Sequence, residues 1–379
     1  MIFMLDTISV FTGICLVAYG LFVTWAAWHY ARIPSFVSEE SSWPGVTLLV
    51  AARNEAAQLE KCLSSLESQQ YPGDFLEIIV VNDHSGDATP ALLDSWANPD
   101  KGHKVIHLAE SMGKKAAIEA GVSQARGEII LQTDADCWMG PDWARQMVGS
   151  FAPETVMVSG PVLLEVSEGS FGQKIFGRLQ QLEYLGLSAL GAGSMQGGMP
   201  NLANGANLAF RRSAFVAAGG FATVDHFASG DDEMLLQKFN RLGWKMRFVR
   251  SLKAATFTPV QPDWASFAAQ RLRWVSKARY YSQRKTNLVQ LTSYLGFWFF
   301  PVAGAQWLFS GEPQWLIAGV VYKLSTDWPL MFQAAKQMNR LYLLAWFLLL
   351  EIAYIPYVLW VGLAGNFIKS YQWKGRWVK

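Results

Sequence analysis

The chain has 379 residues and a formal net charge of +2, with 51% hydrophobic, 14% aromatic and 16% charged residues. A charge so close to neutral does not point to nucleic acid as a partner, and the apolar share exceeds that of an ordinary soluble enzyme. The three cysteines, Cys15, Cys62 and Cys137, are widely spaced, so we expect neither a disulfide framework nor a Cys-x-x-Cys site.

The first predicted element is a membrane anchor at the N-terminus. Residues 5–30 form an almost uncharged stretch, and about 20 apolar residues suffice to cross the hydrocarbon core of a bilayer. No basic segment precedes this stretch, which favours a retained anchor over a cleaved signal peptide. Asp6 lies near its start and Arg32 after it, so the positive-inside rule places the following chain in the cytoplasm. We assign residues 1–31 to this transmembrane anchor.

Between residues 44 and 151, apolar strand-like runs alternate with helical patterns. The predicted strands span residues 46–52, 76–81, 105–108 and 128–133, and the predicted helices span residues 55–68, 89–96 and 114–125. Strands separated by helices predict an α/β fold with a mostly parallel sheet and right-handed crossovers. No Gly-x-Gly-x-x-Gly motif follows the first strand, which disfavours the ordinary dinucleotide-binding version of such a fold.

Acidic residues follow three of these strands. Glu55 comes soon after the first, Asp83 after the second, and Asp134 and Asp136 at the end of the fourth. Ligands bind beyond the carboxyl ends of the strands in α/β folds, and an Asp-x-Asp pair offers hard oxygen ligands to a divalent cation. One such residue by itself is more often a turn or helix-cap residue. The three strand ends together favour a site for a metal ion and a diphosphate.

The segments after the fourth strand carry further polar positions. Residues 171–187 form an amphipathic pattern that is typical of either a core helix or a helix in the bilayer interface, and both interpretations stay open. Residues 191–198 are rich in glycine and are expected to be flexible, and Asn204 and Asn207 follow them. Asp231 and Asp232 precede another amphipathic helical pattern, where they are functional carboxylates, the start of the helix, or both.

Gln270, Arg273 and Trp274 stand three and four residues apart in a predicted helix, so they share one face. An arginine there can pair with a diphosphate, and a tryptophan offers a flat apolar wall to a sugar ring or a lipid-linked acceptor. We interpret the neighbouring Arg271 and Arg284 as surface residues that hold this helix near anionic lipid.

The last part of the chain is apolar again, in three segments at residues 288–310, 314–333 and 341–367. The middle segment carries Lys323 and Asp327, which are costly in lipid unless they face protein or water. We therefore expect two crossings and one partial segment. We assign residues 286–370 to transmembrane or interfacial helices and residues 371–379 to a basic cytoplasmic tail.

Six short motifs occur in order along the chain: Val50-Ala-Ala-Arg-Asn-Glu55, Val80-Val-Asn-Asp-His-Ser85, Gly113-Lys-Lys-Ala-Ala117, Asp134-Ala-Asp136, Gly230-Asp-Asp232 and Gln270-Arg-Leu-Arg-Trp274. This set resembles the family 2 inverting glycosyltransferases of the GT-A fold. It is most similar to their membrane-integrated branch, which includes cellulose, chitin and hyaluronan synthases and ceramide glucosyltransferase. The resemblance implies a cytoplasmic GT-A catalytic domain at residues 44–285. The chain departs at Gly230-Asp231, where the family often shows Thr-Glu.

The resemblance also implies roles for the donor-side residues. Glu55 and Asp83 match positions that contact the nucleoside. Lys114 or Lys115, at the start of a predicted helix, would place a cation beside the diphosphate, and of the two we select Lys114. Asp134 would contact the ribose or the metal, and Asp136 would coordinate Mg²⁺ or Mn²⁺ bridging the two phosphates.

On the acceptor side, Asp232 matches the general base that deprotonates the acceptor hydroxyl, with Asp231 as its acidic neighbour. Gln270, Arg273 and Trp274 match a donor-binding motif. The residues expected near the acceptor are Trp274, Asn204 and Asn207.

The expected function is that of an integral membrane glycosyltransferase of the bacterial inner membrane, with its catalytic domain in the cytoplasm. It would transfer a sugar from a nucleoside-diphosphate donor, with a UDP-sugar preferred, to a lipid or lipid-linked acceptor. The tail motif Trp373-Lys-Gly-Arg-Trp377 is similar to the ending of ceramide glucosyltransferases, with different spacing. The alternative is a processive polysaccharide synthase with a glycan acceptor, although such enzymes usually have more crossings. A scaffold that binds nucleotide sugars without catalysis is a minor alternative.

Overall fold

The computed structural model describes residues 2–34, 43–72, 75–166, 168–222, 231–276, 284–367, 371–373 and 376–378. Gly230 of the predicted acidic motif and Lys374 and Gly375 of the tail motif therefore lie outside the described residues. The chain forms two compact units that interleave along the sequence. The helical unit contains Met1–Arg32, Val166–Met199 and Val260–Tyr371, and the sheet unit contains Ile33–Glu165, Pro200–Pro259 and Gln372–Lys379. The extent of the catalytic domain, expected at residues 44–285, stays a prediction.

The sheet unit is built on a seven-stranded sheet in the order β3-β2-β1-β4-β8-β6-β9. The strands are β1 (Val46–Ala52), β2 (Leu76–Asn82), β3 (His103–His107), β4 (Ile129–Asp134), β6 (Thr155–Ser159), β8 (Leu208–Arg211) and β9 (Lys245–Phe248). β3, β2, β1 and β4 are parallel, and β8 runs antiparallel to its neighbours β4 and β6. The predicted α/β architecture with a mostly parallel sheet is confirmed.

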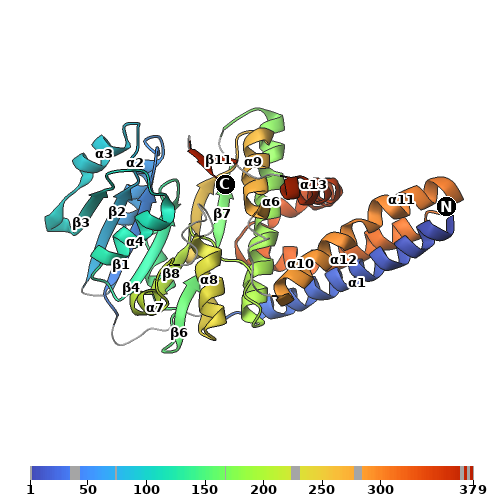
Figure 1. Ribbon diagram of the computed structural model, residues 1–379, viewed down its shortest axis with the longest axis horizontal. Coiled ribbons are helices and arrows are strands. Elements are labelled where there is room, and N and C mark those ends of the chain that lie inside the picture. The colour runs from blue at the N-terminus through green and yellow to red at the C-terminus, as the bar shows by residue number, and fades with distance from the viewer. Residues whose placement is uncertain are drawn as a thin grey trace. The chain divides into compact units, whose positions relative to one another are not determined.

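The first four strands form because their apolar runs are covered on both faces. Six of the seven residues of β1 are buried, as are six of the seven residues of β2, which is the pattern of central parallel strands. The crossover helices are α2 (Leu59–Glu67), α3 (Thr89–Trp96) and α4 (Lys114–Gln124), and Figure 1 shows them beside these strands. Their burial places the core of the unit around β1, β2 and β4.

One predicted helix begins later than expected. The pattern predicted a helix from residue 55, but α2 starts at Leu59. The Glu55 N–H donates to Thr89 Oγ1 (2.9 Å), and the Ala56 N–H donates to Asp87 Oδ2 (3.2 Å). These side chains stabilise a loop conformation because they satisfy N–H groups at the end of β1. The expected helical start is therefore wrong by about one turn.

Shorter elements complete the sheet unit. A second sheet pairs β5 (Trp138–Met139), β10 (Thr256–Pro259) and β7 (Val162–Glu165) in that order. The remaining helices are α5 (Trp143–Val148), α7 (Arg212–Ala217), α8 (Asp231–Arg241) and the 3₁₀ turns η1 (Pro99–Lys101) and η2 (Leu252–Ala254). A two-stranded pair at the C-terminus consists of β11 (Tyr371–Trp373) and β12 (Arg376–Val378).

The helical unit consists of long helices from three parts of the chain. They are α1 (Ile2–Ala31), α6 (Phe171–Gln196), α9 (Trp264–Ser276), α10 (Arg284–Phe297), α11 (Phe299–Ser310), α12 (Gln314–Gln337), η4 (Leu341–Trp346) and α13 (Phe347–Phe367). In Figure 1, α1 runs alongside α11 and α12. The apolar segment expected at residues 288–310 is formed by α10 and α11.

The segment expected to be flexible at residues 191–198 is instead mostly helical, because it forms the end of α6. Its glycines allow two helices to approach closely: a Cβ added at Gly193 would lie 2.1 Å from the Ala26 carbonyl oxygen of α1. Small residues serve this purpose at membrane helix contacts. α6 also packs on α12, with Leu182 and Leu185 buried, so in the described structure it is a core helix of its unit.

Three described helical segments are long and apolar enough to cross a membrane: Asp6–Ala31, Arg284–Ser310 and Leu341–Gly365. α12 is not among them, and it buries Lys323 and Asp327. The burial agrees with the expectation that this segment is not a simple crossing. The number of crossings and the side of the tail stay predictions.

Candidate functional site

The carboxyl ends of β1, β2 and β4 lie level at one edge of the sheet. Ala52 pairs with Asn82, and Ala51 pairs with Asp134, so the chain leaves the three strands side by side. Asp83 follows Asn82 directly. The strand ends expected to carry the polar residues therefore meet at the same edge, as the alternating pattern predicted.

Asp83 organises the loop that leads into α4. Its carboxylate accepts hydrogen bonds from the Met112 N–H (2.8 Å) and the Gly113 N–H (3.1 Å), and it lies 3.6 Å from Arg53 Nη1. The residue is only 2% exposed. Asp83 thus shapes the turn at the start of α4, while its contact with a nucleoside stays a prediction. The same holds for Glu55, which is half-buried in the loop after β1.

Lys114, the first residue of α4, is held between carboxylates from two distant parts of the chain. Its Nζ lies 2.6 Å from Asp134 Oδ1 and 3.2 Å from Asp231 Oδ2. Burial by itself would lower the pKa of Lys114, but Asp134, Asp231 and Asp232 outweigh burial and raise this pKa above its ordinary value. Lys114 is therefore a permanent cation. We call Lys114, Asp134 and Asp231 the Lys114 network.

Two neighbours pack tightly against this network. Gln132 Nε2, on β4, donates to Asp231 Oδ2 (2.8 Å) and to the Gly205 carbonyl oxygen (3.3 Å). A Cβ added at Gly205 would lie 2.8 Å from Lys114 Nζ and 2.9 Å from Asp231 Oδ2. Only glycine fits at position 205 without displacing the cation or its partner.

Asp231 and Asp232 are adjacent in sequence but differ in their surroundings. Asp231 is 5% exposed. Its carboxylate forms an ion pair with Lys114 and accepts a hydrogen bond from Gln132. Asp232 is half-buried, and its two oxygens accept from the Gly205 N–H (2.8 Å) and the Glu233 N–H (2.8 Å). The interpretation that these acids begin a helix is confirmed, because both lie in the first turn of α8, while their functional role stays a prediction.

Asp134 and Asp136 provide the oxygen ligands that a divalent cation would use. Both are partly exposed, and the Asp134 side chain is 34% exposed. Among the described residues, no group of three or more His, Cys, Asp or Glu side chains could hold a metal ion by itself. Two carboxylates nonetheless fit Mg²⁺ or Mn²⁺, because such ions take one or two carboxylates and complete their shell with water and substrate phosphates.

Two buried cysteines lie near this pair. Burial raises the pKa of the Cys62 and Cys137 thiols, and Asp136 and Asp134 raise it further. The Cys137 thiol lies 3.5 Å from Asp136 Oδ1 as a weak donor. Mg²⁺ and Mn²⁺ prefer oxygen ligands to sulfur, and the two aspartates supply oxygen atoms at this edge of the sheet.

The two asparagines expected near an acceptor separate into different roles. Asn207 is completely buried: its Nδ2 donates to the Pro161 and Ala254 carbonyl oxygens (2.7 and 2.8 Å), and its Oδ1 accepts from Trp143 Nε1 (2.9 Å). This placement contradicts direct contact with an acceptor, because the amide already ties three segments together. Asn204 is half-buried, and its acceptor role stays a prediction.

The motif on α9 belongs to the helical unit. Gln270, Arg273 and Trp274 are all half-buried, and their roles stay predictions. Arg271 is 3% exposed, forms a two-point ion pair with Glu183 of α6, and donates from Nη1 to Gln270 Oε1 (2.6 Å). The interpretation of Arg271 as a lipid-facing surface residue is therefore wrong.

Several important residues were not identified from the sequence. Gln132 is a polar residue inside an apolar strand just before Asp134, and this position was a usable signal. Glu183 is an acid within a mostly apolar helix, and it predicts a buried partner in the same way. Arg53 offered no comparable signal, since an arginine in a loop is ordinarily exposed.

Known proteins are similar to this chain in sequence. Residues 47–214 match the family model described as Glycosyl transferase family 2. The Beta-monoglucosyldiacylglycerol synthase of Synechocystis sp. is 38% identical over 115 residues, which cover 30% of this chain and 24% of that protein. The N-acetylglucosaminyltransferase of Mesorhizobium japonicum is 26% identical over 241 residues, covering 61% of this chain and 55% of that protein. The matched part thus spans from about a quarter to just over half of these relatives.

Among solved structures, the mannosyltransferase PcManGT from Pyrobaculum calidifontis, in complex with GDP-Man and Mn²⁺, is similar with a TM-score of 0.60. It is 22% identical, and the match covers 88% of this chain and 99% of that one. This likeness confirms the GT-A type of the predicted α/β fold. Over residues 47–214, the chain is thus similar to glycosyl transferase family 2 in sequence.

Proposed function

We propose that this chain is a membrane-bound, metal-dependent inverting glycosyltransferase. It transfers a sugar from a nucleoside-diphosphate donor to a lipid or lipid-linked acceptor at the cytoplasmic face of a membrane. The observation that carries the proposal is the convergence of Asp134 and Asp231 on the Lys114 cation at the carboxyl end of β4, with Asp232 next to them. Residues more than 90 positions apart meet there in a domain of the matching family.

On the donor side, Lys114 binds the diphosphate of the nucleotide sugar. A permanent cation at the first residue of α4 stands where backbone N–H groups and the helix dipole also favour negative charge. Asp134 and Asp136 would hold Mg²⁺ or Mn²⁺, which supplies charge neutralisation for the departing diphosphate. Glu55 and Asp83 lie at the ends of the neighbouring strands and would contact the nucleoside.

The acceptor-side proposal assigns proton transfer to Asp232. Each of its oxygens accepts one backbone N–H bond, and each oxygen of a carboxylate keeps a second lone pair. A carboxylate fixed in this way can accept the proton of an acceptor hydroxyl while that oxygen attacks the anomeric carbon. Asp231 is a positioning residue, because its contacts with Lys114 and Gln132 hold the start of α8 beside β4.

Two features support a lipid acceptor over a polymer. Three long apolar helices accompany the domain, and one relative's name describes synthesis of a glucosyl diacylglycerol. The processive polysaccharide synthase remains the alternative, since another relative is an N-acetylglucosaminyltransferase.

The test is a transfer assay with the purified full chain, Mn²⁺, a panel of UDP- and GDP-sugars, and a bacterial lipid extract. Mass spectrometry of the organic phase should show one lipid species that gains a single hexose or N-acetylhexosamine. A growing polymer in place of a glycolipid would favour the alternative. No transfer with any donor, while nucleotide sugars still bind, would support the non-catalytic scaffold.

A further inference from the structure

The helical unit contains a second buried network of charges, which the proposed chemistry does not use. Lys323 on α12 forms ion pairs with Asp327 of the same helix (2.8 Å) and with Glu351 of α13. The Tyr19 hydroxyl of α1 donates to Asp327 Oδ1 (2.9 Å). We call Lys323, Asp327 and Glu351 the Lys323 network. Ionisable groups among apolar membrane-type helices are costly, so they usually mark a functional site.

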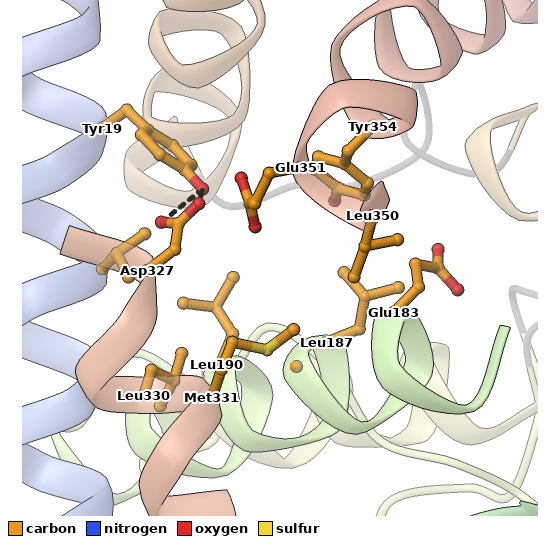
Figure 2. A pocket seen from close by; sticks show the side chains of 12 residues that line it. Tyr19, Glu183, Leu187, Leu190, Asp327, Leu330, Met331, Leu350, Glu351 and Tyr354 are labelled. Atoms are coloured by element: carbon orange, nitrogen blue, oxygen red, sulfur yellow. Dashed lines mark hydrogen bonds between the residues drawn. The ribbon is translucent and has the colours of Figure 1, made fainter. Parts of the chain in front are cut away.

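This network forms one wall of a cavity. The cavity has a volume of about 60 Å³ and lies between α1, α6, α12 and α13. Asp327, Glu351 and Tyr354 line its polar side, and leucines from three helices, among them Leu187 and Leu350, line its apolar side. Figure 2 shows the Asp327 and Glu351 side chains next to one another beside these apolar groups. A cavity with a polar and an apolar side fits an amphiphile.

The charged groups that line the cavity are all acids. Glu183, Asp327 and Glu351 line it, whereas their ion-pair partners Lys323 and Arg271 are not part of the lining. Among the described residues, the lining therefore offers no cation to a phosphate. The Tyr354 hydroxyl also lines the cavity and makes no hydrogen bond within the described part of the chain. Such a surface accepts hydrogen bonds from neutral hydroxyl groups and repels phosphate.

The cavity is physically connected to the motif on α9. Glu183 accepts from Arg271 Nε (3.2 Å), and the Arg271 guanidinium lies 4.2 Å above the Trp274 ring. The Tyr184 and Trp274 rings are also in contact, with centroids 5.8 Å apart. The wall that carries Glu183 is thus continuous with the helix that offers Trp274 to an acceptor.

We propose that this cavity binds the polar end of a neutral lipid with a free hydroxyl, of the diacylglycerol type, and selects it against polyprenyl phosphates. The proposal rests on the proposed glycosyltransferase function, since the bound lipid is its acceptor. Before transfer, the free hydroxyl of the lipid bonds to Glu351, Asp327 or Tyr354, and the acyl chains lie along the leucine side. The acidic lining, which contains no cation among the described residues, disfavours lipids whose head group is a phosphate.

The binding test uses the full chain in phosphatidylcholine nanodiscs that contain a diazirine-bearing diacylglycerol. After irradiation, peptide mass spectrometry should place the label on the cavity faces of α6, α12 and α13. Dioleoylglycerol should compete about tenfold better than undecaprenyl phosphate. Label spread evenly over the outer helix surfaces, or equal competition by the two lipids, would overturn the proposal.

Two variants test the cavity itself. Leu187→Trp fills the apolar side and should lower labelling about tenfold, whereas Leu308→Trp, on the exposed surface of α11, should leave it unchanged. Tyr354→Phe removes only a hydroxyl without a hydrogen-bond partner, so the protein should fold normally and label about fivefold less. Tyr342→Phe, at an exposed tyrosine outside the cavity, is its matched control. Full labelling of both cavity variants would contradict the assignment.

A third variant tests the selection by charge. Glu351→Gln removes one of the three acids of the lining and keeps the side-chain volume, so competition by undecaprenyl phosphate should improve toward that of dioleoylglycerol. An unchanged preference would show that charge does not select the lipid.

Failure of this inference can be told apart from failure of the proposed function. Labelling needs no donor, so labelling without sugar transfer would contradict only the glycosyltransferase proposal. If Leu187→Trp and Tyr354→Phe both still transfer sugar to diacylglycerol at the unaltered rate, only the assignment of the cavity would be contradicted.

Discussion

The two units of this protein each contain a lysine between two carboxylates, but the two networks differ in their access to water. In the Lys114 network the lysine side chain is 18% exposed and Asp134 is 34% exposed. In the Lys323 network the lysine is 2% exposed and each acid 9%. In the first network the charges can exchange partners with a charged solute from water. In the second they hold helices together, and only Asp327 and Glu351 face the cavity.

The difference follows from where each network sits in its unit. The Lys114 network lies at the carboxyl ends of strands, where side chains leave the sheet and meet loops. The Lys323 network joins helices that are apolar along most of their length, and an unpaired charge there has no water to solvate it. Exposure, and not the kind of residue, therefore separates a network that water reaches from one that is shielded from water. The following experiments test that distinction.

Removing divalent metal should have the largest effect, and only on the sheet unit. Chelation with EDTA should abolish sugar transfer, because without a metal ion the carboxylates of Asp134 and Asp136 would repel the departing diphosphate instead of binding the cation that neutralises it. Excess Mn²⁺ should restore activity. The thermal unfolding midpoint should be the same in the two conditions, because described residues supply no closed metal site that the fold depends on. Full activity in EDTA would contradict the metal assignment.

Asp232→Asn should have the next largest effect. Loss of a general base lowers the turnover number by about 10²–10⁴-fold, while the amide still offers one oxygen to the backbone N–H groups that Asp232 now binds. Donor affinity, measured by isothermal titration, should change little. Glu233→Gln, at the next acid of α8, is the matched control and should keep most activity. Undiminished turnover in Asp232→Asn would rule out the base assignment.

Lys323→Met should be the most destabilising single change of the two networks. It leaves two carboxylates buried without their cation, and removing one partner of a buried ion pair costs about 3–5 kcal/mol of unfolding free energy. Chemical denaturation in detergent micelles measures the change. Adding Asp327→Asn and Glu351→Gln to the same chain should recover most of the loss. If the triple variant is no more stable than Lys323→Met, charge burial is not the cause.

Lys114→Met should destabilise the fold less, by about 1–3 kcal/mol, because water reaches Asp134. It should also raise the donor KM about tenfold through loss of the phosphate-binding charge. Lys115→Met is the control, since Lys115 is buried against Met234 Sδ (3.3 Å) and should affect stability rather than KM. Equal KM values for the two variants would contradict the role of Lys114.

The pH dependence gives the smallest expected effect. The pKa of Lys114 is raised in the folded protein, so its stabilising contribution is complete below the ordinary lysine value of 10.5 and is lost only as pH rises through the higher folded value. Between about pH 6 and pH 9, Lys114 should cause no titration step in the unfolding free energy or in the turnover number. The pH profiles of the unaltered protein and of Lys114→Met should therefore have the same shape. Such a step, measured from pH–rate profiles of both proteins, would mean that the lysine titrates during catalysis.

Much of the sheet unit was predictable because its signals are local. The apolar run of β1 was predicted with its observed bounds, and so was the helix at residues 89–96. The start of α2 was missed because Thr89 and Asp87 satisfy the N–H groups of Glu55 and Ala56 from a segment about 30 residues away. No periodicity within residues 55–58 contains that information.

The site was predictable as a set of residues and not as a set of roles. Asp134, Asp231 and Asp232 were identified as acids of one site, but packing decides that the first two pair with Lys114 and that Asp232 accepts backbone N–H bonds. Asn207 shows the limit most clearly. An asparagine near the motif looks available for an acceptor, and only the fold reveals that Trp143 and two carbonyl oxygens already occupy it.

By itself the sequence determined the alternation of strands and helices, the apolar segments, and the order of the acidic motifs, because each depends on neighbouring residues and their periodicity. Only the tertiary structure decided which charges are buried and with which partner. The segments around Arg271 and Lys323 fit either an exposed or a buried charge. Arg271 pairs with Glu183, which is 88 residues away, and Lys323 pairs with Glu351, which is 28 residues away. The free energy of a charge depends on its solvation and its partner, and both are properties of the folded chain.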